Sequence, residues 1–198
     1  MKFWMLGAPL LFAALLGAAT PASAQAPAAV AAPADNSEMA AMFAADQAPR
    51  GDTAAAVDWA VVAAADEARL ARTRMLLDAG ALRTGNDFYR AAFIFQHGST
   101  PADYMLAHTV AVIAAARGRS DAAWIAAASM DRYLQSVGHA QIFGTQFRTP
   151  DRQNTTQEPY DRTLVSDALR EAMGVPTLAQ QEVRRRELEA RYRAAPRP

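Results

Sequence analysis

The sequence predicts an all-α protein, a compact bundle of αα-hairpins with one polar loop over its core. Two observations support this fold class. No stretch of the 198 residues alternates apolar and polar side chains over the length of a strand. In addition, alanine-rich segments with apolar residues at helical spacing are repeatedly closed by glycine, at positions 80, 98, 118, 138 and 174.

Residues 1–24 are expected to be a signal peptide and not part of the fold. Lys2 precedes an apolar run over residues 3–19, and Ala22-Ser23-Ala24 forms a small-residue cleavage site. No cysteine is present there for a lipid anchor, and no second apolar run of membrane-spanning length follows. We therefore expect a periplasmic or secreted protein without a membrane anchor after cleavage. Residues 25–37, rich in alanine and proline, are expected to form a flexible leader.

The composition of the mature chain excludes several classes of function. It has no cysteine, which rules out disulfides and a thiol nucleophile. Without Lys2 it carries 19 basic residues, all arginine, and 20 acidic ones. This balance argues against a nucleic-acid partner.

The helical domain is expected over residues 38–178, and its first helices have recognisable ends. The expected helices of the whole chain cover residues 38–47, 53–79, 87–97, 101–117, 120–137, 163–173 and 178–193. Asp52 is a suitable N-cap for the second helix, and Asp66 could begin a separate helix within it. The third helix follows Asn86 and ends at Gly98.

The central helices carry the clearest start signal. Thr100, Pro101 and Asp103 occupy the N-cap, first and third positions of a helix. Ser120 is expected to cap the next helix, which Gly138 closes.

The chain after Gly138 changes in character. Residues 139–161 contain polar and proline signals and are expected to form mostly loop. A short helix over residues 163–173 follows. Residues 179–198 have few apolar positions and many charges, which predicts a solvated surface helix or a frayed tail.

Two of these helices place polar side chains among apolar ones. The helix over 101–117 is apolar nearly all round and carries His108; the helix over 120–137 carries Asp131 on an otherwise apolar face. A buried carboxylate must be paired and hydrogen-bonded. The candidate partners of Asp131 are His97, His108, an arginine of another helix, or backbone donors of residues 141–147.

Most of the chemistry-bearing side chains fall in one part of the sequence. Residues 96–146 contain Gln96, His97, His108, Asp131, Arg132, Gln141, Thr145 and Gln146, and they include all three histidines of the chain. Together these residues form the candidate site.

The same residues resemble a known pattern. The run 96-QHG-98, the run 131-DRYL-134 and the segment Gln141 to Phe147 with its 144-GTQF-147 end are similar to an uncharacterised bacterial family, a domain of unknown function. Asp46-Gln47 and Arg170 also fit that pattern. The resemblance covers most of residues 38–178 and implies a shared site and shared domain limits. It implies no activity, since none is established for the family.

Several roles are open for these residues. His97 could be a general base oriented by Asp131, or both could belong to a buried hydrogen-bond network that fixes helix packing. His97, His108 and Asp131 are weak candidates for three metal ligands, because the usual helical spacing of histidine ligands is absent.

The loop residues and Arg170 also have competing roles. Gln141, Thr145 and Gln146 could bind a ligand or cap helix ends. Arg170 is expected to pair with Asp131, to bind an anion or to lie at the surface, and Asp46-Gln47 to cap the bundle. No motif identifies a cofactor, a phosphate-binding loop or an activated serine.

Three functions follow from these alternatives. The first is binding of a small polar ligand or peptide at the cluster of Gln96, His97, Asp131, Arg132, Gln141 and Gln146. The second is a hydrolase-like enzyme in which His97 acts with Asp131. The third is an envelope protein-interaction module whose polar core is purely structural.

Overall fold

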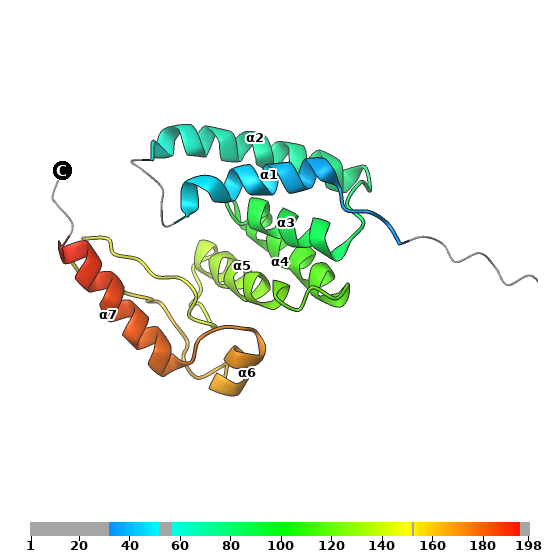
Figure 1. Ribbon diagram of the computed structural model, residues 1–198. Coiled ribbons are helices and arrows are strands. Elements are labelled where there is room, and N and C mark those ends of the chain that lie inside the picture. The colour runs from blue at the N-terminus through cyan, green and yellow to red at the C-terminus, as the bar shows by residue number, and fades with distance from the viewer. Residues whose placement is uncertain (1–31, 52–56, 152, 195–198) are drawn as a thin grey trace, which may run out of the picture. The chain divides into compact units, whose positions relative to one another are not determined.

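The computed structural model describes residues 32–51, 57–151 and 153–194, and it confirms the all-α fold class. The helices in Figure 1 are α1 (Ser37–Gln47), the short 3₁₀ helix η1 (Ala48–Arg50), α2 (Trp59–Asp78), α3 (Gly85–Phe95), α4 (Pro101–Ala116), α5 (Ala122–Ser136), α6 (Asp167–Ala172) and α7 (Leu178–Ala194). Within these residues, sheet-like pairing is limited to two isolated bridges, Gln141 with Tyr160 and Arg148 with Thr156.

The predicted signal peptide and most of the predicted leader lie outside the described residues. The end of that leader, however, is hydrogen-bonded to the helices. Asn36 caps α1 by accepting a hydrogen bond from the backbone N–H of Met39. Asp35 accepts a hydrogen bond of 2.7 Å from the Thr84 hydroxyl, just before α3. The folded part therefore includes Asp35 and Asn36.

Helices α3 and α4 begin with the same device, a capping box in which an N-cap threonine and an N3 aspartate bond each other's backbone N–H. For α4 these residues are Thr100 and Asp103, as predicted. For α3 they are Thr84 and Asp87, so the prediction that this helix simply follows Asn86 was wrong.

Three other predicted helix starts differ from the structure. Helix α2 is continuous through Asp66 and is capped by Asp58; the expected cap, Asp52, lies outside the described residues. Ser120 does not cap α5, which begins one residue after Asp121. Helix α6 begins only at Asp167, because residues 161–164 form a turn in which the Asp161 carboxylate accepts two backbone hydrogen bonds.

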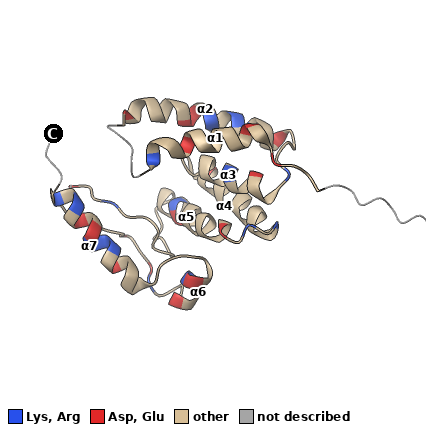
Figure 2. Cartoon of the chain, viewed as in Figure 1, with Lys and Arg blue, Asp and Glu red and all other residues tan. Residues whose placement is uncertain are grey.

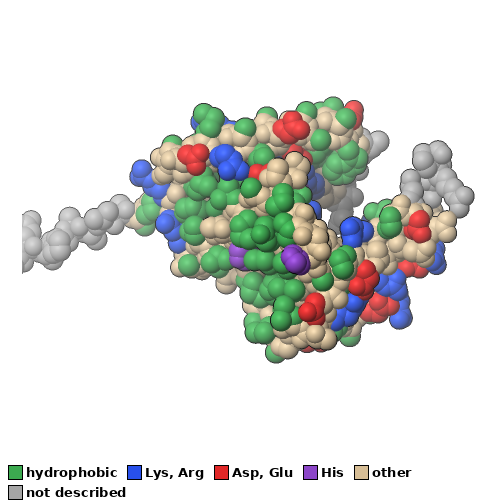
Figure 3. All heavy atoms as spheres, turned by 180° about the vertical axis from the view of Figure 1, so that it is seen from behind, with side chains coloured by type: hydrophobic (Ala, Val, Ile, Leu, Met, Phe, Trp, Pro, Cys, Tyr) green, Lys and Arg blue, Asp and Glu red, His purple; other side chains and the backbone are tan. Residues whose placement is uncertain are grey.

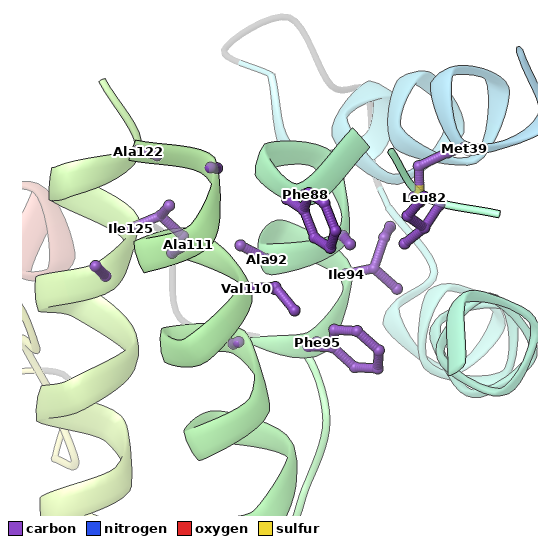
Figure 4. Close-up of a cluster of buried hydrophobic side chains, with 14 of the residues drawn as sticks. Met39, Leu82, Phe88, Ala92, Ile94, Phe95, Val110, Ala111, Ala122 and Ile125 are labelled. Atoms are coloured by element: carbon purple, nitrogen blue, oxygen red, sulfur yellow. The ribbon is translucent and has the colours of Figure 1, made fainter. Parts of the chain in front are cut away.

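The core lies where α3, α4 and α5 pack as successive antiparallel hairpins, with α4 in the middle and α1 and α2 against α3 (Figure 1). Small side chains allow this close approach. The fully buried alanines are Ala91 and Ala92 of α3, Ala107, Ala111 and Ala114 of α4, and Ala122 and Ala127 of α5. Larger side chains such as Phe95, Ile94, Val110 and Ile125 fill the remaining space (Figure 4).

The surface carries both apolar and charged regions. Helix α4, apolar nearly all round, packs against α3 and α5 but leaves one side open, where Val112 is 48 % exposed. Figure 3 shows hydrophobic and histidine side chains gathered in the middle of one face. Helix α7 carries basic and acidic side chains interspersed along its length (Figure 2). Among the described residues, every helix is too short or too polar to cross a membrane.

Candidate functional site

Asp131 is fully buried on α5 and is satisfied by the loop that follows that helix. Its Oδ1 atom accepts hydrogen bonds from the backbone N–H groups of Ile142 and Phe143, at 2.8 and 3.0 Å. Its Oδ2 atom accepts bonds from the N–H and the hydroxyl of Thr145, at 2.9 and 2.8 Å. Of the partners considered from the sequence, the backbone donors of residues 141–147 are therefore the correct ones.

The side chains of the two glutamines in this loop hold its conformation through hydrogen bonds. Gln141 is fully buried; its Oε1 atom accepts a bond of 2.9 Å from the backbone N–H of Gln146, and its amide donates to the carbonyl of Gln146 at 3.0 Å. The Gln146 amide donates to the carbonyl of Ala128 on α5 and to the Thr145 hydroxyl. Gln141, Thr145, Gln146 and Asp131 thus form one network that fixes the loop on α5.

Residues from farther along the chain donate hydrogen bonds to the backbone carbonyls of this loop. The carbonyl of Phe143 accepts bonds from the hydroxyl of Tyr160 and the amide of Gln181, at 3.1 and 2.9 Å. The Gln157 amide donates to the carbonyl of Gly144. Gln157, Tyr160 and Gln181 were not predicted as part of the site. Nothing in the sequence of a polar loop or a charged helix shows which of its side chains will be buried.

Arg170 lies in this second layer and does not pair with Asp131. It is fully buried, yet it reaches the Tyr160 hydroxyl at 3.1 Å and Asp167 at 3.2 Å, and it donates to the backbone carbonyl of Val165. The Arg170 guanidinium is therefore satisfied by the Asp167 carboxylate together with the Tyr160 hydroxyl and backbone carbonyls. Neither anion binding nor a surface position, both considered from the sequence, agrees with these contacts.

His97 lies beside Asp46, and the predicted pair of His97 with Asp131 is not formed. The His97 Nε2 atom is 3.5 Å from Asp46 Oδ2, close enough for an ion pair when the ring is protonated but not aligned for a hydrogen bond. The prediction failed because sequence spacing does not show which of several buried carboxylates faces a histidine.

Asp46 belongs to a group of charges that joins α1, η1 and α2. Arg50 contacts both Asp46 and Asp66, at 3.1 and 2.6 Å, and Arg69 contacts Asp66 at 2.5 Å. Burial opposes ionisation of Asp46, but the contacts with His97, Arg50 and Gln47 outweigh it and hold the pKa of this carboxyl below its ordinary value. His97, Asp66 and Ser99 also line a cavity of about 190 Å³.

The remaining predicted residues are dispersed. Gln96 is buried at the end of α3. His108 uses Nδ1 to contact the carbonyl of Ala126 at 2.9 Å, which joins α4 to α5. Because His97, His108 and Asp131 each have a different neighbour, the suggested metal triad is not formed, and no group of three metal-binding side chains occurs within the described ranges.

Arg132 differs from Asp131 and Arg170 because part of its buried side chain has no hydrogen-bond partner within the described part of the chain, as is also true of His97 and Ser129. It is mostly buried, and burial lowers the pKa of its guanidinium; Tyr104 opposes this shift, and no carboxylate contributes. The Arg132 Nε atom and the Gln135 Nε2 atom are both buried without a hydrogen-bond partner among the described residues. Buried donors of this kind are rare in folded proteins.

Arg132 and Gln135 both line one open cavity of about 370 Å³, named here the Arg132 pocket. Its wall consists of Tyr104, Arg132, Gln135, Ser136, Gln146, Phe147 and Arg148. It contains two arginines and no acidic residue. Two predicted ligand-binding residues, Arg132 and Gln146, therefore lie together, whereas His97 and Asp131 lie elsewhere.

Comparison of the chain with protein-family models, curated proteins and solved structures finds no significant match to any of them.

Proposed function

We propose that this protein binds a small anionic ligand in the Arg132 pocket. The observation that carries the proposal is the Arg132 guanidinium, which lines this pocket and has no carboxylate partner among the residues that the structure describes. Desolvating a guanidinium without a carboxylate partner is unfavourable for folding. An acidic ligand would supply the missing acceptor.

The other residues of the pocket favour the same class of ligand. Arg148 adds a second guanidinium, and Ser136 and Gln146 add uncharged polar groups. The Tyr104 and Phe147 rings provide apolar walls. A pocket of about 370 Å³ lies at the small end of the range for ligand sites. Carboxylates and phosphates match the planar fork of arginine best.

The test is a titration of the mature protein with acetate and with phosphate at constant ionic strength, followed by calorimetry and thermal unfolding. A ligand at 100 times its dissociation constant adds about 2.7 kcal/mol to the free energy of unfolding. For a chain of this length that raises the melting temperature by about 5–10 °C.

Two variants make the titration specific. Arg132→Gln is expected to abolish the anion-dependent shift without lowering the stability of the free protein, because Arg132 has no carboxylate partner to lose. Arg191→Gln, at an exposed position of α7, is the control and is expected to keep the shift. Equal anion responses in the wild type and in Arg132→Gln would contradict the proposal.

A second candidate function, hydrolysis, is supported by the contact between His97 and Asp46. A buried carboxylate beside an imidazole can orient a general base, and His97 and Ser99 line the same cavity. A screen of ester, amide and phosphoester substrates with the wild type and His97→Gln tests it. A loss of at least about 100-fold in turnover, with stability nearly unchanged, supports catalysis. Equal rates for the two proteins exclude it.

Two expectations from the sequence accompany the main proposal. We propose export through the signal peptide over residues 1–24, which mass determination of the protein recovered from cells tests directly. We also keep the resemblance to a domain of unknown function as a proposal. The third function considered was an interaction module with a purely structural polar core. The structural role of the buried network is compatible with it, but no feature of the protein identifies a partner.

A further inference from the structure

A second cavity adjoins the Arg132 pocket. It has a volume of about 120 Å³, and its apolar wall consists of Trp124, Phe147, Val175 and Pro176. We call it the Trp124 cavity. Phe147 lines both cavities, and the neighbouring residues Thr145 and Gln146 line one each. The loop fixed by Asp131 is therefore the common border of the two.

The two cavities also lie on one face of α5. Trp124, Arg132 and Gln135 are separated by eight and three residues, so they project from the same side of the helix. The rise of an α-helix places Trp124 and Arg132 about 12 Å apart along the axis. An extended peptide covers this distance with about four residues.

The chemistry of the two cavities is complementary. The Arg132 pocket contains two cationic side chains and no acid, whereas the Trp124 cavity has a mainly apolar surface, with Thr145, Gln181 and Arg184 as its polar residues. Trp124 is 40 % exposed, so an aromatic surface is available beside Phe147. Tryptophan and arginine are among the residue types enriched at binding hot spots.

We propose that the ligand of this protein is a short peptide with a free C-terminal carboxylate and an apolar residue about three positions before its end. This inference rests on the proposed anion-binding function and extends it. The carboxylate binds Arg132, and the apolar side chain enters the Trp124 cavity. Gln146 also lines the pocket; its NH₂ group already donates to Ala128 and Thr145, so its side-chain oxygen is the group left to accept a hydrogen bond from a peptide N–H.

Three peptides test the proposal by calorimetry: N-acetyl-Leu-Ala-Ala-Ala as the free acid, the same peptide amidated at its C-terminus, and N-acetyl-Ala-Ala-Ala-Ala as the free acid. The free leucine peptide is expected to bind at least about tenfold more tightly than its amide, because a charge-assisted hydrogen bond is lost in the amide. It is also expected to bind at least about tenfold more tightly than the alanine peptide, since each buried methylene contributes about fourfold.

Trp124 provides an independent readout of the apolar contact. In the mature protein, Trp59→Phe leaves Trp124 as the sole tryptophan. The leucine peptide is expected to shift its emission, and the alanine peptide is not. Arg132→Gln should remove the preference for the free acid over the amide, whereas Arg191→Gln should retain it.

The outcomes separate the two proposals. If acetate or phosphate binds through Arg132 but the leucine and alanine peptides bind equally, or Trp124 emission does not change, the peptide inference is wrong and anion binding stands. If neither the small anions nor the free-acid peptides bind, both proposals are wrong. Tight binding of the amidated leucine peptide would also overturn the assignment of the carboxylate to Arg132.

Discussion

Asp131 holds the loop after α5 through four hydrogen bonds, all donated by residues 142–145. Three of the donors are backbone N–H groups, so they need an acceptor whatever side chains the loop carries. Asp131 directly precedes Arg132, but neighbouring side chains diverge on a helix, and Asp131 is not among the groups that shift the pKa of Arg132. This arrangement leaves Arg132 free for a ligand.

Asp131→Asn removes the charge and replaces one acceptor oxygen with an NH₂ group that faces N–H donors. We expect the free energy of unfolding to fall by about 2–4 kcal/mol, because buried donors lose a charged acceptor. Urea denaturation measures the loss. Asp121→Asn is the control: Asp121 is exposed and contacts Arg119, so its loss should stay below about 1 kcal/mol.

Gly144 is required by both its backbone conformation and its surroundings. Its φ is +83°, and a Cβ atom there would lie 2.1 Å from Gln181 Oε1 and 2.5 Å from the Tyr160 hydroxyl. Gly138 has a similar φ of +81° but no heavy atom within 4 Å of such a Cβ. Gly138→Ala should therefore cost only the backbone strain, about 1–2 kcal/mol. Gly144→Ala should cost at least about 2 kcal/mol more, measured by urea denaturation, and equal losses would show that the contacts do not matter.

At the scale of the elements, ion pairs connect the C-terminal end of helix α1 to the neighbouring helices. Its last turn places Asp46 against His97, and Arg50 of η1 extends the contact to Asp66 of α2. The burial of Asp46 makes these contacts stronger than exposed ion pairs of the same length. We infer that the position of α1 depends on the ionisation of this carboxylate.

The pKa of Asp46 is lowered in the folded protein, so the folded state binds its proton more weakly than the unfolded state. The resulting stabilisation is present above the ordinary carboxyl pKa of 3.8 and is lost as the pH falls through the lower value of the folded state. In Asp46→Asn, stability near neutral pH should fall, and the slope of stability against pH below the ordinary carboxyl pKa of 3.8 should decrease. Unfolding curves from neutral pH down through this acidic range measure both. An unchanged slope would contradict the assignment.

At the scale of the whole molecule, features encoded within a few residues were predictable. The start of α4 was clear because Thr100, Pro101 and Asp103 act on backbone groups within one turn. The equivalent signal of α3, Thr84 with Asp87, is also present in the sequence, but the adjacent Asn86 is a competing N-cap candidate. The burial of Asp131 and its loop partners was also inferable, since a carboxylate on an apolar face requires nearby donors.

Contacts between distant segments were not predictable in the same way. Asp46 contacts His97 although 51 positions separate them in the sequence, and Gln181 contacts Phe143 although 38 positions separate them. Several alternative partners were chemically equivalent, and only the packing of the helices selects among them. The Arg132 pocket depends on such packing too, because residues of α4, α5 and the following loop must all reach it.

The network around residues 141–147 joins α5 to α6 and α7, so we expect the helices and this C-terminal part to unfold together. Trp124 reports on the junction, because it lies on α5 and lines a cavity with Val175 and Pro176. In Trp59→Phe protein produced without residues 1–24, urea transitions followed by Trp124 emission and by far-ultraviolet circular dichroism should coincide. Adding Asp131→Asn removes the main bond between the loop and α5. The emission transition should then occur at a lower urea concentration than the transition of total helix content. Coincident transitions in that variant would show that packing alone, without the Asp131 network, couples the C-terminal part to the bundle.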